Sequence, residues 1–260
     1  MAADLYFGHG EAWLGSRTAG GEVDDFDVDL PEINSLVITP GREKVEHISK
    51  RTEIAGKDLS VTRMVMMSGT LNVSTHTKEL LELYLYGNIA AVAGGSFAAN
   101  DNVFGDSTII NGQTLPLPNN LTHVSSLVLT DSAGSPATLV LNTDYEIVDA
   151  DAGIVRFLDV SGLTQPFKAA GTQAAGSNVG ILTQRLFEKH MRFKGINIAD
   201  DDKVCIVDLY RCSFEPAAQW QLLNDGSDVN AYELNFEALI DSTKAVDATL
   251  GRYGRYRELT

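Results

Sequence analysis

Cysteine is scarce in this chain. Its 260 residues include two cysteines, Cys205 and Cys212, which lie seven apart and form no CxxC or zinc-binding pattern. If they belong to one strand, they stand roughly 23 Å apart along it and point to opposite faces, so they cannot bond to each other. This excludes an intrachain disulfide between them and predicts two buried free thiols in a reducing compartment.

Long apolar runs are also missing. No window reaches the roughly 18 continuous apolar residues that a membrane helix needs. The first residues, MAADLYFGHGEAWLG, lack the basic start and the apolar stretch of a signal peptide. We therefore expect no membrane span and synthesis in the cytoplasm.

Basic residues are outnumbered. The chain has 20 Lys and Arg against 35 Asp and Glu, a net charge of −15 and a pI near 4.6. A surface this acidic repels phosphate backbones, which disfavours a protein that grips DNA or RNA. The acidity would also serve solubility alone. Apolar residues at 44% and charged residues at 21% are typical of a folded protein with one large domain or two modest ones.

Catalytic signatures are absent from the sequence as well. The five histidines stand in no HxH or HExxH pattern, and there is no GxSxG, Walker or GxGxxG element in a phosphate-binding context. The glycines of FGHGEAWLG are interpreted as turn residues. No pattern points to a Ser-His-Asp triad, although sequence alone leaves one open because its members can be distant along the chain. We predict that the protein is not an enzyme and has no cofactor.

The sequence does carry strong β patterns. Residues 59–74, LSVTRMVMMSGTLNVS, alternate between a mostly apolar and a mostly polar face, and their methionines are interpreted as core filler. Upstream, SLVITPGREKVEHISK indicates a short strand and then a turn at Pro40-Gly41. One helix is predicted over 75–87, with a cap at Ser74, Thr75 or Thr77 and a stop at Gly87. Its apolar stripe consists of Leu80, Leu81, Tyr84 and Leu85.

Two stretches are rich in acids. DADAG, residues 149–153, resembles the start of a calcium loop, but Gly153 is fifth instead of sixth and Val160 stands where a Glu is required. Because Asp and Gly gather at hairpin tips, NTDYEIVDADAGIVRF, residues 142–157, is better explained as a β-hairpin without a metal. GEVDDFDVDLPE, residues 21–32, is interpreted as an edge strand or an extended arm, with chelation as an alternative.

Composition divides the chain. Residues 88–125 and 163–180 are rich in Gly, Ala, Asn and Ser, and short strand runs lie between them, which suggests an inserted β module. Strands return afterwards in KVCIVDLYRCSFE and AYELNFEALID. In the second of these, alternation places Tyr232, Leu234, Phe236, Ala238 and Ile240 on one face and Glu233, Asn235 and Glu237 on the other.

The order of these parts resembles a known family. LYFGHGEAWLG leads to a long strand that runs directly into TKELLELYLYGN, an insertion carries a DYxxDxxxGxxxF-like hairpin, and β-rich strands close the chain. This order is similar to that of the major tail tube proteins of long-tailed bacteriophages. The resemblance implies a mainly β fold, a β-sandwich or half-barrel with one packed helix. The tube core would comprise 1–103 and 181–260, and the inserted β module at 104–180 would lie on the tube exterior.

The resemblance also implies a structural role. Six subunits would join strands into a ring, and rings would stack into the hollow tail tube of a virion, through which genome DNA is ejected. The expected partners are copies of the chain itself, a tape measure protein and a tail terminator, with no cofactor and no catalytic residue. A β-rich chain suits such a role, because unpaired sheet edges need partners and heterologous contacts along an axis give a filament.

Charge suggests candidate residues for such a tube. An acidic wall would repel DNA within the roughly 8–10 Å that physiological salt allows, so that DNA slides without specific binding. Glu233, Asn235 and Glu237 are the candidate lumen-facing residues, with an ordinary solvated face as the alternative. The acidic run and the basic tail GRYGRYRELT have opposite signs, and they are the candidate inter-subunit contacts, setting register more than strength. These contacts are Asp24, Asp25, Asp27, Asp29, Arg252, Arg255 and Arg257.

Two alternatives stay open at this point. The same core would serve a tail terminator or the tube protein of a contractile machine. A carbohydrate-binding β-sandwich is the alternative from another class, but it requires exposed aromatics beside a groove, whereas Trp13 and Trp220 are far apart in the sequence.

Overall fold

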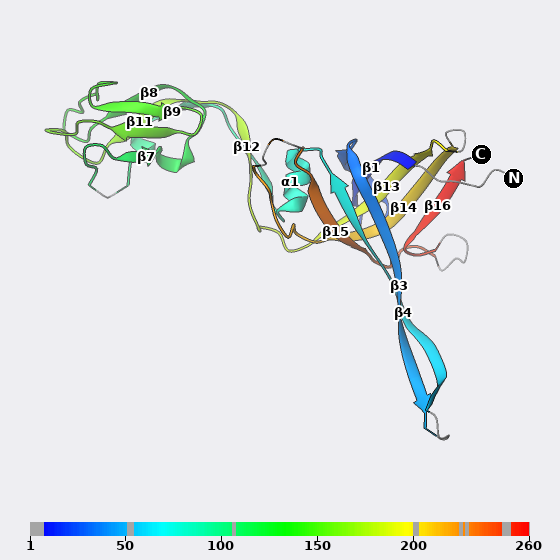
Figure 1. The fold of residues 1–260 in the computed structure, drawn as a ribbon. Coiled ribbons are helices and arrows are strands. Elements are labelled where there is room, and N and C mark those ends of the chain that lie inside the picture. The colour runs from blue at the N-terminus through cyan, green and yellow to red at the C-terminus, as the bar shows by residue number, and fades with distance from the viewer. Residues whose placement is uncertain are drawn as a thin grey trace. The chain divides into compact units, whose positions relative to one another are not determined.

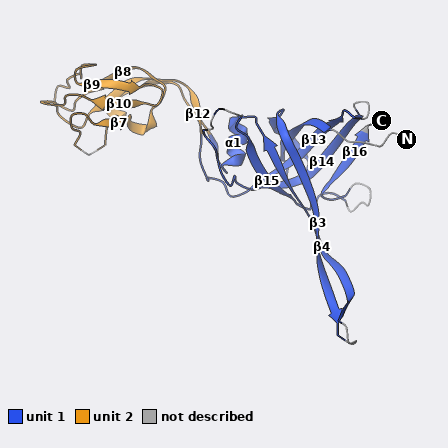
Figure 2. Ribbon diagram, viewed as in Figure 1, with its two compact units in different colours: residues 1–89, 179–260 blue, residues 90–178 orange. Residues whose placement is uncertain are grey.

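The computed structural model describes residues 8–50, 55–105, 108–199, 203–223, 226, 229–245 and 251–259. Over these residues the protein is mainly β, with a single α-helix (Figure 1). This confirms the fold class predicted from the alternating patterns. The chain folds as two compact units, residues 1–89 with 179–260 and residues 90–178 (Figure 2).

The second unit begins earlier than the sequence predicted. It spans 90–178, whereas the inserted module was predicted at 104–180. The difference arises because β6 (Gly95–Phe97) pairs with β11 (Lys168–Gln173), so a stretch that looks like loop is a strand of this unit. The two strands pair closely: a Cβ atom at Gly171 on β11 would lie 2.9 Å from the ring of Phe97 on β6.

One eight-stranded sheet forms most of the first unit. Its hydrogen-bonded order is β2-β1-β13-β14-β15-β4-β3, and β16 pairs with β14 outside this path. The bounds are β1 Gly8–Arg17, β2 Val23–Leu30, β3 Ile33–Ser49, β4 Gly56–Val73, β13 Phe187–Asn197, β14 Lys203–Phe214, β15 Tyr232–Ala238 and β16 Gly254–Leu259. The two ends of this order, β2 and β3, are joined by only Pro31 and Glu32. The sheet must therefore curl toward closure without closing, as a half-barrel does.

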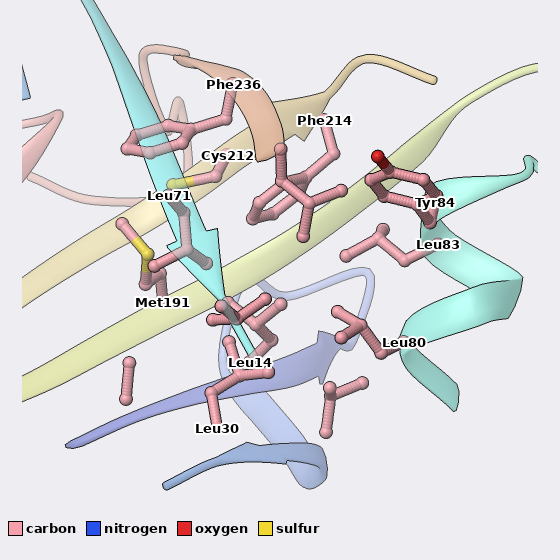
Figure 3. Close-up of a cluster of buried hydrophobic side chains, with 14 of the residues drawn as sticks. Leu14, Leu30, Leu71, Leu80, Leu83, Tyr84, Met191, Cys212, Phe214 and Phe236 are labelled. Carbon is pink, nitrogen blue, oxygen red and sulfur yellow. The ribbon is translucent and has the colours of Figure 1, made fainter. Parts of the chain in front are cut away.

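The curled sheet encloses the core of the first unit. Strands from both ends of the sheet order contribute to one cluster, in which Leu14, Leu30 and Leu71 are fully buried (Figure 3). The helix α1 (Lys78–Tyr84) adds Leu80, Leu83 and Tyr84 to the same cluster. Burying these side chains is the main term that holds the helix, which is too short to be stable alone.

The helix is shorter than the predicted 75–87. Thr77 caps it, as one of the three predicted caps, and its side chain accepts a hydrogen bond from the Leu80 amide. At the other end Tyr86, with φ of 49°, makes the left-handed turn, and the Gly87 amide donates to the Glu82 carbonyl at 2.7 Å. The helix therefore ends at Tyr84, three residues before the predicted end at Gly87.

Strands β3 and β4 form a long two-stranded ribbon, part of which projects beyond the rest of the sheet (Figure 1). The predicted turn at Pro40-Gly41 was wrong, since both residues lie inside β3. Proline is tolerated there because β3 is an edge strand, where a missing N–H costs no ladder bond on the open side. The predicted strand 59–74 corresponds to β4, but Met64 and Met66 are 49% and 43% exposed, so they are not core filler.

The second unit has its own core between two three-stranded sheets, β7-β10-β9 and β6-β11-β8. Phe157, Phe167 and Val155 are fully buried in it. Its remaining strands are β7 Thr114–Pro116, β8 Val124–Thr130, β9 Tyr145–Asp149 and β10 Ile154–Phe157, and its short 3-10 helices are η1 Ala99–Asp101 and η2 Pro118–Asn120. Two further strands, β5 (Ile89–Val92) and β12 (Gly176–Val179), pair where the chain passes between the units.

The acidic stretch 142–157 is the predicted hairpin. Strands β9 and β10 pair antiparallel, and DADAG forms the connection. The Asp149 carboxylate accepts a hydrogen bond from the Ala152 amide at 2.9 Å, and Gly153 has φ of 65°. The acid thus closes a turn, which is the role that short polar side chains commonly have at such sites.

Candidate assembly surfaces

The outer face of β3, β4 and β15 is a polar surface without basic residues. On β15 the core-facing side chains Leu234 and Phe236 are buried, which leaves Glu233, Asn235 and Glu237 on the other face, as alternation predicted. Ile240, predicted to continue the apolar face, lies beyond the strand and is 44% exposed. The prediction was therefore right for the strand and wrong for its continuation.

Cross-strand pairing extends this surface over three strands. Antiparallel neighbours that stand directly opposite share a face. The rows are Thr39, Ser68 and Glu237; Val37, Thr70 and Asn235; and Ser35, Asn72 and Glu233. The Thr70 hydroxyl donates to the Asn235 side-chain oxygen at 3.0 Å. We call these nine residues the polar ladder; Val37 is its one apolar member, and none of the nine is Lys or Arg.

The acidic run is an edge strand and not a free arm. Residues 23–30 form β2, which pairs with β1 and has no further partner among the strands of the described sheet. Asp24, Asp25, Asp27 and Asp29 are all exposed. Asp27 accepts from Ser16 at 2.7 Å and from Lys189, so its ionic partner within the chain is on β13.

The basic tail is partly engaged within its own chain. Arg255 on β16 donates through Nε to Oδ2 of Asp208 at 2.9 Å, and the backbone oxygen of Arg252 accepts from the Asp241 amide at 3.0 Å. Arg257, opposite Ile206, is exposed. The structure brings none of the three arginines to the acidic strand. Because Arg255 already binds Asp208 of its own chain, it is less free to make a contact between subunits.

Asp208 is the centre of a buried polar cluster on β14. Its side chain is 1% exposed, and it also accepts from Arg192 Nε at 2.5 Å. Burial alone would raise the pKa of Asp208. The pKa is instead held well below its usual range, because the carboxylate is surrounded by His190, Arg192 and Arg255. His190 Nε2 lies 3.6 Å from Oδ1, longer than a hydrogen bond, so the arginines make the firm contacts.

This cluster joins strands and is unsuited to proton transfer. A carboxylate whose pKa is strongly depressed is a poor general base near neutral pH. The imidazole of His190 is packed against Phe26 and Tyr210, with ring centroids 6.0 and 6.2 Å away. The cluster therefore ties β13, β14 and β16 together. Sequence reasoning missed it because its members are scattered between residues 190 and 255.

The part of the chain that the structure describes shows neither a cluster of metal ligands nor a membrane-spanning helix. There, no three His, Cys, Asp or Glu side chains gather in a way that could hold a metal ion. Within the same residues, no helix has the length and apolar character to cross a membrane. Cys205 and Cys212 are both buried and are not joined by a disulfide, and burial raises the pKa of Cys212 far above its usual value.

Fold and surfaces together define a mainly β protein of two units, with an unclosed sheet, an uncovered polar ladder and a projecting β3–β4 ribbon. The chain belongs to the family described as Protein of unknown function UCP028589, whose model matches residues 5–257. No curated protein matches the sequence.

Proposed function

We propose that this protein is the tube subunit of a long-tailed bacteriophage tail. Copies join into rings, and the rings stack into a hollow tube that conducts genome DNA. We expect six copies in each ring because the sequence resembles those of tail tube proteins. The protein acts as a building block without catalysis or a cofactor. It is made in the host cytoplasm and resides in the virion tail, where a tape measure protein and a tail terminator are its further partners.

The observation that carries the proposal is the polar ladder. A surface of Ser, Thr, Asn and Glu without Lys or Arg offers DNA phosphates no cationic partner, so DNA near it is repelled or passed along. The ladder lies on a sheet whose other face holds the core, and strands are the elements that a closed ring can continue from one copy to the next. Glu233, Asn235 and Glu237 are the lumen residues in this proposal.

The unclosed sheet supports the same proposal. Strands β2 and β3 are both at ends of the sheet order, and each presents backbone donors and acceptors along its outer side. Two different edges of one chain can pair between copies in a head-to-tail manner, which closes into a ring when the rotation fits. The acidic β2 with Asp24, Asp25, Asp27 and Asp29, and Arg257 with its neighbours on β16, remain the charged contacts proposed between subunits.

The position of the protein in virions tests this function. Antibodies against the purified protein, detected by electron microscopy, should decorate the whole tail shaft of the source phage. Decoration at one end of the shaft would favour a tail terminator instead, and a shaft surrounded by a contractile sheath would favour the contractile-machine alternative. Virions without any label, combined with binding to a glycan array, would replace the proposal by carbohydrate binding.

A further inference from the structure

One face of the projecting part of the β3–β4 ribbon carries a row of exposed apolar side chains. Residues that stand opposite each other on β3 and β4 share a face. On this face the pairs are Gly41 with Met66, Glu43 with Met64, Val45 with Val61 and His47 with Leu59. The apolar members of these pairs are 43% to 53% exposed. We call them the apolar stripe: Val45, Leu59, Val61, Met64 and Met66.

A β-bulge creates this stripe. Glu43 is opposite Met64 but the next residue, Lys44, is opposite Thr62, so Arg63 is the extra residue on β4. The bulge moves Val61 and Leu59 to the face of Met64 and moves Thr62 and Ser60 to the other face. Without it, strict alternation would mix apolar and polar residues on both faces. The bulge thus gathers five exposed apolar side chains on one side of the ribbon, while Val65 lies on the other side opposite Arg42.

The polarity of the ribbon is the reverse of that in the body of the sheet. Near the body, the face that carries the stripe is the polar ladder, and the opposite face carries the core residues Leu36 and Leu71. Farther out, this opposite face carries the charged residues Arg42, Lys44 and Glu46, with the exposed Val65 opposite Arg42. A two-stranded hairpin is marginally stable by itself in water, and its exposed apolar stripe is characteristic of a surface that another molecule covers.

The charge of the ribbon indicates what covers it. Residues 42–63 contain six of the 20 Lys and Arg and four of the 35 Asp and Glu, which gives this segment a net charge of +2 and leaves −17 for the rest of the chain. A basic segment on an otherwise strongly acidic protein is attracted to a second copy of the same chain, because opposite net charges steer encounter and register.

The same chain carries a groove elsewhere whose lining is partly apolar and partly polar. A groove of about 600 Å³ lies between the start of β1 and the start of β3, with Leu36, Ile38, Phe193 and Val207 among its lining residues. Glu32 lies at this groove too, two residues after the end of the acidic strand β2. Its size is in the range of pockets that bury small ligands, roughly 300–1,000 Å³, and so suits a few side chains rather than a domain.

We propose that the apolar stripe of one copy docks in this groove of a second copy, with the basic ribbon beside the acidic strand β2. The stripe and the groove are different patches of one chain, so the contact is heterologous and leaves a free stripe and a free groove at the ends of every assembly. It therefore propagates, as contacts along a filament must. This contact rests on the proposed function in one respect, because both require that copies of the chain bind one another.

Cysteine cross-linking in solution tests the contact. Val61→Cys places a thiol on the stripe and Glu32→Cys places one at the groove, and a short bismaleimide joins thiols that come close. Mixing the two single variants should give covalent dimers, the double variant should give a ladder of multimers, and neither single variant should cross-link alone. The control pair, Val61→Cys with Asp151→Cys in the second unit, should give neither dimers nor ladder.

Substitutions on the two faces of the ribbon provide the second measurement. Val61→Glu on the stripe should weaken self-association at least tenfold in sedimentation experiments, whereas Thr62→Glu on the opposite face should change it less than twofold. Circular dichroism of both variants checks that the sheet is retained. Dimers from Val61→Cys alone would show that ribbons pair with ribbons and would overturn the proposal, as would equal effects of the two substitutions.

The outcomes separate this inference from the tube function. Hollow tubes from a double-cysteine variant that never cross-links would overturn the docking and leave the function. A cross-linked ladder that never forms a hollow tube would support the docking and count against the function. A chain that stays monomeric at all concentrations would overturn both.

Discussion

Asp208 on β14 stands directly opposite Arg255 on β16, and the two side chains are joined by a hydrogen bond of 2.9 Å. The carboxylate is 1% exposed and also binds Arg192 on β13, so one buried acid connects three strands. Strand β16 has only β14 as a neighbour in the described sheet, and this contact attaches it there through a side chain. The basic tail is therefore partly a structural element of its own subunit.

Replacing this acid should destabilise the first unit. Asp208→Asn leaves the guanidinium groups of Arg192 and Arg255 without their anion, and breaking such a buried pair from one side costs about 3 kcal/mol of unfolding free energy. Urea denaturation of the variant and of the parent protein measures the change. The control Asp29→Asn, at an exposed acid, should stay within about 0.5 kcal/mol. Equal midpoints for Asp208→Asn and the parent would contradict the assignment.

The same acid should make stability depend on pH. The pKa of Asp208 is lower in the folded protein than in the unfolded chain, so its stabilising contribution is complete above the unfolded value of about 4. Below that, the contribution is lost as the pH falls toward the folded-state pKa. The stability difference between the parent protein and Asp208→Asn should therefore be largest near neutral pH and shrink below pH 4. A difference that is constant from pH 7 to pH 3 would refute this reading.

Gly69 on β4 should tolerate no side chain. A Cβ atom there would lie 2.4 Å from the Phe236 ring and 2.5 Å from the Val37 carbonyl oxygen. Gly69→Ala therefore forces the core to shift and should lower the unfolding free energy by about 1 to 3 kcal/mol. Gly56→Ala is the matched control on the same strand, since nothing lies within 4 Å of its Cβ position. The two variants should differ clearly in thermal denaturation, and similar melting temperatures would be evidence against close packing at Gly69.

The polar ladder should control how DNA behaves in assembled material. Glu233→Lys with Glu237→Lys adds cations to a face that has none, so assemblies of this variant should retain short duplex DNA about tenfold more than the parent at low salt and lose the excess at high salt. Filter retention of labelled DNA measures this. Glu146→Lys with Asp151→Lys makes the same charge change in the second unit and should retain less. If the control pair retains as much DNA, the ladder has no special exposure to it.

Much of the fold follows from local pattern, and particular residues show where pattern fails. The hairpin at 142–157 and strand β15 were predictable because strict alternation and turn residues agree there. The Pro40-Gly41 prediction failed because a proline reads as a turn unless one knows that its strand is at an edge. Met64 and Met66 were misread as core because the projection of the ribbon is a tertiary property.

Bulges explain the remaining misreadings. Cys205 and Cys212 were expected on opposite faces, but β14 has an extra residue between Leu209 and Cys212, which are paired with Met191 and Lys189. Leu209 and Cys212 consequently both lie in the core. The bulge at Arg63 likewise gathers the apolar stripe. Alternation predicts faces only as far as the register is unbroken, and a single sequence does not reveal where it breaks.

Electron microscopy of the purified protein, over a series of concentrations, tests self-assembly most directly. If copies complete one another's sheets around a polar bore, hollow tubes of uniform diameter with a regular axial repeat should appear as the concentration rises. A population that remains single compact particles throughout, with no rings or tubes at any concentration, would contradict the account.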